Sequence, residues 1–154
     1  NHIYRHRRVM ITGHTGFKGS WLALWLSQMG ADITGYSLPP PTEPNHFDLL
    51  HLDVESFIGD VRNAEETHII FKEKKPEIVF HLAAQPLVRE SYQEPKLTFE
   101  TNVLGTINPV EQIVAAARDA FGTPEIVIAN GGGPPAMPAV EAWARWAVPK
   151  ASLM

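Results

Sequence analysis

The sequence VMITGHTGFKGS, residues 9–20, decides the fold. Apolar residues lead into Thr12, glycines follow at 13, 16 and 19, and a bulky apolar run begins at Trp21. The first part has the composition of a short buried strand, and the part after Gly19 has the apolar spacing of a helix. The three glycines therefore lie where a strand turns directly into a helix.

Glycines at this spacing meet the needs of a chain that binds a nucleotide pyrophosphate. Gly13 permits a tight turn out of the strand, Gly16 lets the backbone approach a phosphate, and Gly19 lets the helix pack closely. The helix N-terminus then offers backbone N–H donors and the positive end of its dipole. We expect Thr12 and Thr15 to add hydroxyl donors. The alternative is a tight glycine turn without a ligand.

The rest of the chain alternates between short apolar runs and helical patterns. The expected strands are 9–12, 32–38, 57–59, 77–83 and 125–129. The expected helices are 18–29, 63–74, 95–121 with an interruption or kink at Pro109, and a short tail from about residue 140. This alternation predicts an α/β fold, a Rossmann-like doubly wound parallel sheet that is truncated at about five strands.

The composition excludes several classes of function. The 154 residues carry a net charge of −4 and no cysteine, which argues against a nucleic-acid surface, disulfides and thiol chemistry. No apolar run is long enough to cross a bilayer, so we expect no membrane contact and a cytoplasmic protein. The seven histidines show no zinc-like spacing, and the sequence has neither a Gly-x-Ser-x-Gly nor a P-loop pattern.

The residues after the second and third expected strands bear on which dinucleotide binds. A carboxylate for the ribose hydroxyls of NAD should end the second strand, but Tyr36, Ser37 and Leu38 stand there. No arginine for the 2′-phosphate of NADP stands there either, so these residues leave NAD and NADP open. Asp60, just after the third strand, is a candidate partner for the adenine amino group, or else a turn aspartate.

Four motifs resemble the extended short-chain dehydrogenase/reductase family. They are TGHTGFKG at 12–19, GDVR at 59–62, HLAAQPLVR at 81–89 and TNVLGT at 101–106. Within that family the sequence is most similar to the CDP-glucose 4,6-dehydratase branch, over residues 7–107. The resemblance implies a Rossmann fold that binds NAD and a lyase reaction that removes water from a nucleotide sugar, CDP-glucose. It also allows a homodimer, because family members commonly dimerise.

The same resemblance implies which residues contact the cofactor. The pyrophosphate would lie on loop 12–19, adenine beside 60–61, and the nicotinamide ribose along 82–85, with Asn102 as a scaffold behind the site. The implied cofactor-binding residues are Thr12, Gly13, Thr15, Gly16, Phe17, Lys18, Gly19, Asp60, Val61, Leu82, Ala83, Ala84, Gln85 and Asn102. Two alternatives remain open for Arg89, Ser91 and Tyr92. They bind the sugar nucleotide, or they lie on a surface helix or loop.

The resemblance ends after about residue 107. The catalytic Thr-Asp pair of the family should follow the strand expected at 125–129, and the sequence lacks it. The catalytic Tyr-x-x-x-Lys is matched only by Trp146 to Lys150, and an indole N–H cannot act as an acid or base near neutral pH. We therefore expect no catalytic residues, and one dinucleotide-binding domain over 1–154 without a substrate-binding C-terminal domain. The alternatives are a catalytically silent dinucleotide-binding module, or a fragment or chimera that carries a short-chain reductase segment.

Overall fold

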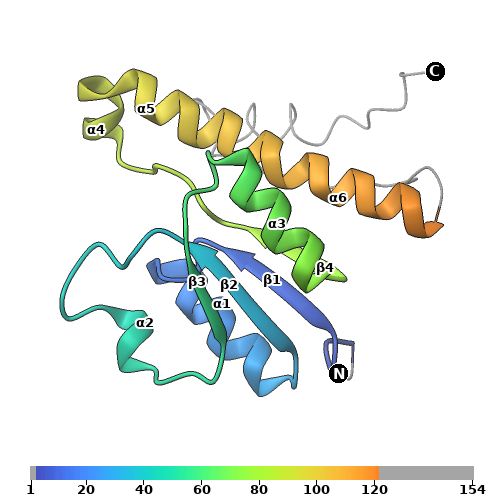
Figure 1. Cartoon of the computed structure of the whole chain (residues 1–154). Helices are drawn as coiled ribbons and strands as arrows, with labels where there is room; N and C mark the ends of the chain where they lie inside the picture. The colour runs from blue at the N-terminus through green and yellow to red at the C-terminus, as the bar shows by residue number, and fades with distance from the viewer. Residues whose placement is uncertain (1–2, 122–154) are drawn as a thin grey trace, which may run out of the picture.

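The computed structural model describes residues 3–121 and shows a parallel sheet with helices on both faces (Figure 1). In spatial order the strands are β3 (Glu55–Ile58), β2 (Asp32–Ser37), β1 (Arg8–Thr12) and β4 (Ile78–His81). The predicted Rossmann-like parallel sheet is confirmed, with four strands in the described residues. The strand expected at 125–129 and the tail from about residue 140 lie outside these residues.

Strand β1 lies inside the sheet and is deeply buried. Val9 pairs with Ile33 of β2 on one side and with Ile78 of β4 on the other. The side chains of Val9, Met10 and Ile11 are at most 1% exposed. The apolar run that precedes the glycines is thus buried on both faces of the sheet, as a parallel strand covered by helices must be.

One face of the sheet is covered by α1 (Phe17–Gln28), with the short helix α2 (His46–Leu49) beside it (Figure 1). Val9 and Ile11 point to this face and pack in one apolar cluster with Leu26 of α1. Because α1 follows directly from the glycine turn, this packing fixes the direction in which the N-terminus of the helix points.

The opposite face is covered by α3 (Ala64–Lys74) and by the long helix α6 (Gly105–Phe121), which lie against each other (Figure 1). Met10 points to this face and packs in a second cluster with Ile70 and Phe71 of α3. Successive side chains of a strand point to opposite faces, so β1 serves both clusters. The chain therefore winds first on one face and then on the other.

The predicted helix ends are confirmed where the sequence carries a specific signal. Asn63 caps α3, because its side chain accepts the N–H of Glu66 at 3.2 Å. Lys75 ends α3 in the left-handed region with φ +44°, directly before Pro76. Gly30 follows α1 with φ +79°, as a glycine at a helix C-terminus does. No helix within residues 3–121 is both long and apolar enough to cross a membrane.

The connecting segments differ from the sequence prediction. The helix expected from residue 95 consists of α5 (Pro95–Phe99), a π-helical turn η1 (Glu100–Leu104) and α6. The helix is not interrupted at Pro109, because α6 continues through this residue, and a kink there stays a prediction. The irregular turn comes before it, and a π turn shifts the hydrogen-bond register ahead of a residue that lacks an N–H donor. Helix α2 is an addition that the sequence pattern does not predict, and α4 (Val88–Gln93) is the surface helix left open as one alternative for Arg89, Ser91 and Tyr92.

Candidate functional site

Two loops meet where β1 and β4 end. Thr12 pairs with His81 in the sheet, so the segments that follow these residues start side by side. Helix α1 leaves β1 toward one face, whereas the chain after β4 leads to helices on the other face (Figure 1). In doubly wound sheets such a reversal between neighbouring strands is where ligands bind. We call this place the strand-end site, formed by residues 12–19 and 81–85.

The three glycines of the strand-end site meet different surroundings. A Cβ on Gly13, which has φ +74°, would lie 2.8 Å from the backbone N of Ala83. A Cβ on Gly19 would lie 2.1 Å from the carbonyl O of Gly13. At Gly16 a Cβ would meet only that same carbonyl, at 3.3 Å, and would otherwise enter open space. Packing of the chain itself thus explains Gly13 and Gly19, whereas Gly16 leaves room for a ligand.

The N-terminus of α1 is suited to an anion. Gly16 is its N-cap and offers no side chain to the first backbone N–H groups, and the first turn contains no acidic residue. The free N–H groups and the helix dipole therefore point their positive end at the space above Gly16. Phe17 and Lys18 are exposed beside it. This N-terminus could hold an anion, and contact of residues 13–19 with a pyrophosphate stays a prediction.

The hydroxyls of Thr12 and Thr15 have partners within the chain. Thr12 Oγ1 lies 2.7 Å from Nδ1 of His81. Thr15 Oγ1 donates to the carbonyl of Leu38 at 2.9 Å and lies 2.9 Å from Oγ of Ser37. Both threonines thus link the glycine turn to a neighbouring strand, and this geometry gives them a scaffolding role. Donation of their hydroxyls to a phosphate stays a prediction.

The end of β2 holds neither a carboxylate nor an arginine. Tyr36 is 3% exposed, and the single proton of its hydroxyl has two acceptors in reach, the carbonyl of Asp60 at 3.0 Å and the carboxylate of Glu66 at 3.3 Å. Burial raises the pKa of Tyr36 to about 12, so the phenol keeps its proton. The side chain of Ser37 is buried and that of Leu38 is exposed. The structure therefore leaves the choice between NAD and NADP to other observations.

His14 is a buried member of the site that sequence reasoning missed. Its ring is 0% exposed, with Nε2 2.7 Å from Oγ of Ser56 and Nδ1 3.1 Å from Oγ of Ser37. Burial lowers the pKa of His14 to about 4, so the imidazole is neutral at pH 7. A Cβ on Gly35 would lie 2.3 Å from this ring. Gly35 lies inside a predicted strand, and a glycine in that position indicates that another group packs closely against the backbone.

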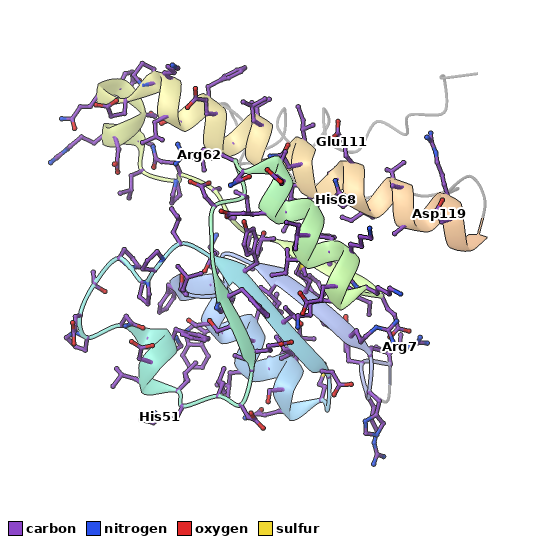
Figure 2. The ribbon with its side chains drawn as sticks, viewed as in Figure 1. Arg7, His51, Arg62, His68, Glu111 and Asp119 are labelled. Carbon is purple, nitrogen blue, oxygen red and sulfur yellow. The ribbon has the colours of Figure 1, made fainter. Side chains whose placement is uncertain are left out.

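Asp60 lies just after β3, and its carboxylate is held by Arg62. The Nε of Arg62 lies 2.9 Å from Oδ2, and the backbone N–H of Arg62 donates to Oδ1 at 2.9 Å. The side-chain hydrogen bond from Arg62 lowers the pKa of Asp60. Arg62 lies between the end of the sheet and the helices that follow β4 (Figure 2). This geometry fits a turn aspartate, and contact with adenine stays a prediction for Asp60.

An open depression of about 480 Å³ adjoins Asp60. Its other lining residues are Arg62, Asn63, Glu100 and Leu104. It lies beside the end of β3 and not over the glycine turn, so it would receive the adenine half of a dinucleotide at most. Val61 is 4% exposed and packs in the apolar cluster with α3, and its carbonyl accepts a hydrogen bond from Asn108 at 2.8 Å. Contact of Val61 with adenine stays a prediction.

The loop after β4 is held by Asn102. Its Oδ1 accepts the backbone N–H of Gln85 at 2.8 Å, and its Nδ2 donates to the carbonyl of Gln85 at 3.1 Å. This geometry fits the predicted scaffold role of Asn102. Between β4 and Gln85, the small residues Ala83 and Ala84 leave the backbone accessible over one side of the strand-end site. Contact of Leu82, Ala83, Ala84 and Gln85 with a cofactor stays a prediction.

The other candidate residues lie apart from the strand-end site or outside the described residues. Arg89, Ser91 and Tyr92 belong to α4, where Tyr92 is 83% exposed and Ser91 donates to a carbonyl of its own helix. Lys150 lies outside residues 3–121. Within those residues no three His, Asp or Glu side chains are grouped to hold a metal ion.

Comparisons with known proteins agree on the kind of fold and family. The model of the family described as GDP-mannose 4,6 dehydratase matches residues 10–125. CDP-glucose 4,6-dehydratase of Salmonella typhimurium is 52% identical over 113 residues, which are 72% of this chain and 32% of that protein. UDP-glucose 4-epimerase of Mycolicibacterium smegmatis is 35% identical over 141 residues, which are 87% of this chain and 43% of that protein.

Solved structures show the same fold. UDP-glucose 4-epimerase of Thermus thermophilus, in a complex with NAD, has a TM-score of 0.63 and 31% identity, over 71% of this chain and 34% of that one. Epimerase Mth375 of Methanothermobacter thermautotrophicus has a TM-score of 0.66 and 27% identity, over 75% of this chain and 34% of that one. The chain thus spans about a third of the length of these structures and of the Salmonella relative.

Proposed function

The chain belongs to the GDP-mannose 4,6-dehydratase family, and from this premise we propose that it is the NAD-binding part of a nucleotide-sugar 4,6-dehydratase. CDP-glucose is the proposed substrate of the whole protein, because the Salmonella relative at 52% identity is a CDP-glucose 4,6-dehydratase. In such a reaction NAD supplies a hydride acceptor for the sugar. The residues described here bind and orient that cofactor.

The observation that carries the proposal is the open space at Gly16 over the uncapped N-terminus of α1. A helix of this kind, directly after a buried strand, is suited to hold two negatively charged phosphates through backbone N–H groups. The backbone of residues 13–19 would hold the pyrophosphate, and the backbone of 82–85 would carry the nicotinamide half. Asp60 and Val61 would flank adenine at the edge of the depression beside β3.

NAD is the proposed dinucleotide. Neither the end of β2 nor the loop after it supplies a cation for the 2′-phosphate of NADP, since Tyr36, Ser37 and Leu38 stand there. The only guanidinium near the depression, among the described residues, is that of Arg62, and it is paired with Asp60. Support from relatives comes from the Thermus epimerase, which was solved with NAD.

A catalytically silent dinucleotide-binding module is the second candidate. The sequence favours it in one respect, because Trp146 stands where the family's proton-transferring tyrosine should stand. Both candidates share the cofactor site and differ in whether this chain can turn over a sugar nucleotide. Cofactor binding is therefore the first property to measure.

Isothermal titration with NAD tests the proposed site. We expect saturable binding by the chain and its loss in Gly16→Val, whose side chain would fill the open space above the helix N-terminus. Ala115→Val adds similar bulk at an exposed position of α6 and should leave binding unchanged. Absence of binding in the folded wild-type chain, or equal binding by Gly16→Val, would overturn the proposal. Tighter binding of NADP than of NAD would overturn the choice of cofactor.

A further inference from the structure

We propose that His81 and Thr106 are positioning residues of the strand-end site. With Thr12 they form a hydrogen-bond chain of fixed direction that holds the backbone of residues 82–85 beside the glycine turn. The inference rests on the proposed function for its meaning, because this loop is the one expected to carry the nicotinamide half of the cofactor. The hydrogen bonds themselves, however, are formed by the protein without any ligand.

The donor-to-acceptor direction of the hydrogen-bond chain is set at Thr12, which is 0% exposed. Its Oγ1 accepts the backbone N–H of Ala83 at 3.2 Å and shares that of Leu82, at 3.1 Å, with the carbonyl of Thr12. A hydroxyl oxygen has two lone pairs and one proton. With its acceptor capacity used by the loop, Thr12 must donate its proton to the third neighbour, Nδ1 of His81 at 2.7 Å.

The tautomer of His81 follows from this donation. A ring nitrogen that accepts a hydrogen bond carries no proton, so the neutral imidazole of His81 has its proton on Nε2. Nε2 lies 3.2 Å from Oγ1 of Thr106 and is the donor of that bond. Thr106 can then give its own proton to the carbonyl of Asn102, which lies 2.8 Å away. The protons donated by Thr12, His81 and Thr106 thus each have one acceptor.

The two ends of this chain hold the two ends of the loop. Thr12 binds the N–H groups of Leu82 and Ala83, and the side chain of Asn102 binds both backbone groups of Gln85. His81 and Thr106 connect these anchors by hydrogen bonds, to Thr12 at one end and to the backbone carbonyl of Asn102 at the other. A cofactor that lies on the backbone of the loop therefore meets a surface whose position depends on two residues that do not touch it.

Burial supports the neutral state of this histidine. His81 is partly buried between β1 and the helix that carries Thr106, and burial lowers its pKa. The imidazole therefore remains a combined acceptor and donor at neutral pH. A doubly protonated ring would present a second N–H to Thr12, whose acceptor capacity is already used.

Two variants at Thr106 test the positioning role. Thr106→Val keeps the shape but removes both the acceptor for His81 and the donor for Asn102, and we expect it to raise the dissociation constant of NAD about tenfold. Thr106→Ser keeps the hydroxyl and should restore the affinity to within about twofold. Both variants should unfold at denaturant concentrations close to that of the wild type, because the side chain is only half-buried. Unchanged affinity in a folded Thr106→Val would overturn the inference.

The tautomer is read independently of any ligand. Imidazole ¹⁵N shifts of His81 in the wild-type chain without NAD should show an unprotonated Nδ1 and a protonated Nε2. The opposite tautomer, or a charged ring at pH 7, would overturn the inference even if NAD binds. If the wild-type chain binds no NAD but the expected tautomer is found, the proposed function fails and the hydrogen-bond chain stands as a device for holding the loop.

Discussion

At the scale of single residues, the strand-end site is built from side chains that bind each other and leave the backbone to a ligand. His14 is the clearest case, since its two ring nitrogens face serine hydroxyls from β2 and β3 and its ring rests where Gly35 has no side chain. A neutral histidine in this place crosslinks the glycine turn to two strands. Among residues 3–121 no carboxylate is paired with this ring, and burial alone lowers its pKa.

We expect the stability of the fold to depend on His14 below neutral pH. The pKa of His14 falls from 6.5 to about 4 on folding, so the unfolded chain binds the proton first as the pH drops. The contribution is complete above about pH 6.5 and is lost toward pH 4, at a cost of about 3 kcal/mol in the free energy of unfolding. Urea unfolding at a series of pH values measures it.

His14→Asn is the control for this dependence, because an amide does not titrate. The variant should be less stable at pH 7, and its free energy of unfolding should fall less steeply between pH 6.5 and 4. The difference between the two slopes isolates His14 from the other histidines. Parallel slopes for the two chains would show that His14 is not the group responsible.

At the scale of elements, local signals in the sequence decided what could be predicted. The strand before the glycines, α1 and α3 carry an apolar period and specific end residues, and all three were placed within a few residues of their bounds. Helix α2 was missed and α4 was left open between a surface helix and a loop, because four and six residues are too few to show a helical period. The first follows a proline-rich loop and the second follows Pro86, and proline points to irregular structure in both places.

In the candidate site, too, the features set by local sequence could be predicted and the long-range side-chain contacts could not. The roles of Gly13, Gly16 and Gly19 follow from spacing alone, since each is a property of the backbone. Contact of the Thr12 hydroxyl with a phosphate stays a prediction, but its hydrogen bond with His81, 69 positions along the chain, was not predicted. No local pattern contains that information. The partner of a buried polar side chain depends on which strands become neighbours.

The cap of α3 permits a test at this scale. Asn63→Ala removes the acceptor for the N–H of Glu66 and should lower the free energy of unfolding by about 1 kcal/mol. Asn63→Asp keeps the acceptor, adds a favourable charge at the helix N-terminus, and should lose little or nothing. Chemical denaturation at pH 7 measures both variants. An equal loss in Asn63→Asp and Asn63→Ala would contradict a capping role.

At the scale of the whole molecule, the chain supplies one part of what its family uses. It spans 32% of the length of the Salmonella relative and carries the glycine turn, the loop after β4 and the turn at Asp60. The catalytic Thr-Asp and Tyr-x-x-x-Lys of the family have no intact match in the 154 residues. Cofactor binding and catalysis are therefore expected to separate in this chain.

We expect the 154-residue chain to bind NAD without converting CDP-glucose. The proposed site needs only backbone groups and scaffolding side chains, whereas proton transfer needs a tyrosine or another acid–base group that Trp146 cannot replace. Chromatography of CDP-glucose after incubation with the chain and NAD measures turnover, with a full-length CDP-glucose 4,6-dehydratase as the positive control. Formation of the 4-keto-6-deoxy sugar nucleotide by this chain would refute the expected separation.

The position of β4 has a consequence for the order of assembly during synthesis. Ser37, the partner of Thr15, is translated only 22 residues after it, so the glycine turn can pack against β2 early in synthesis. The wall made by Leu82 and Ala83 is translated 70 residues after Thr12, and loops of that length close slowly. A nascent chain that ends before β4 contains the glycine turn but lacks the backbone of Leu82 and Ala83 that packs against it. The proposed cofactor site is therefore complete only once β4 has paired with β1.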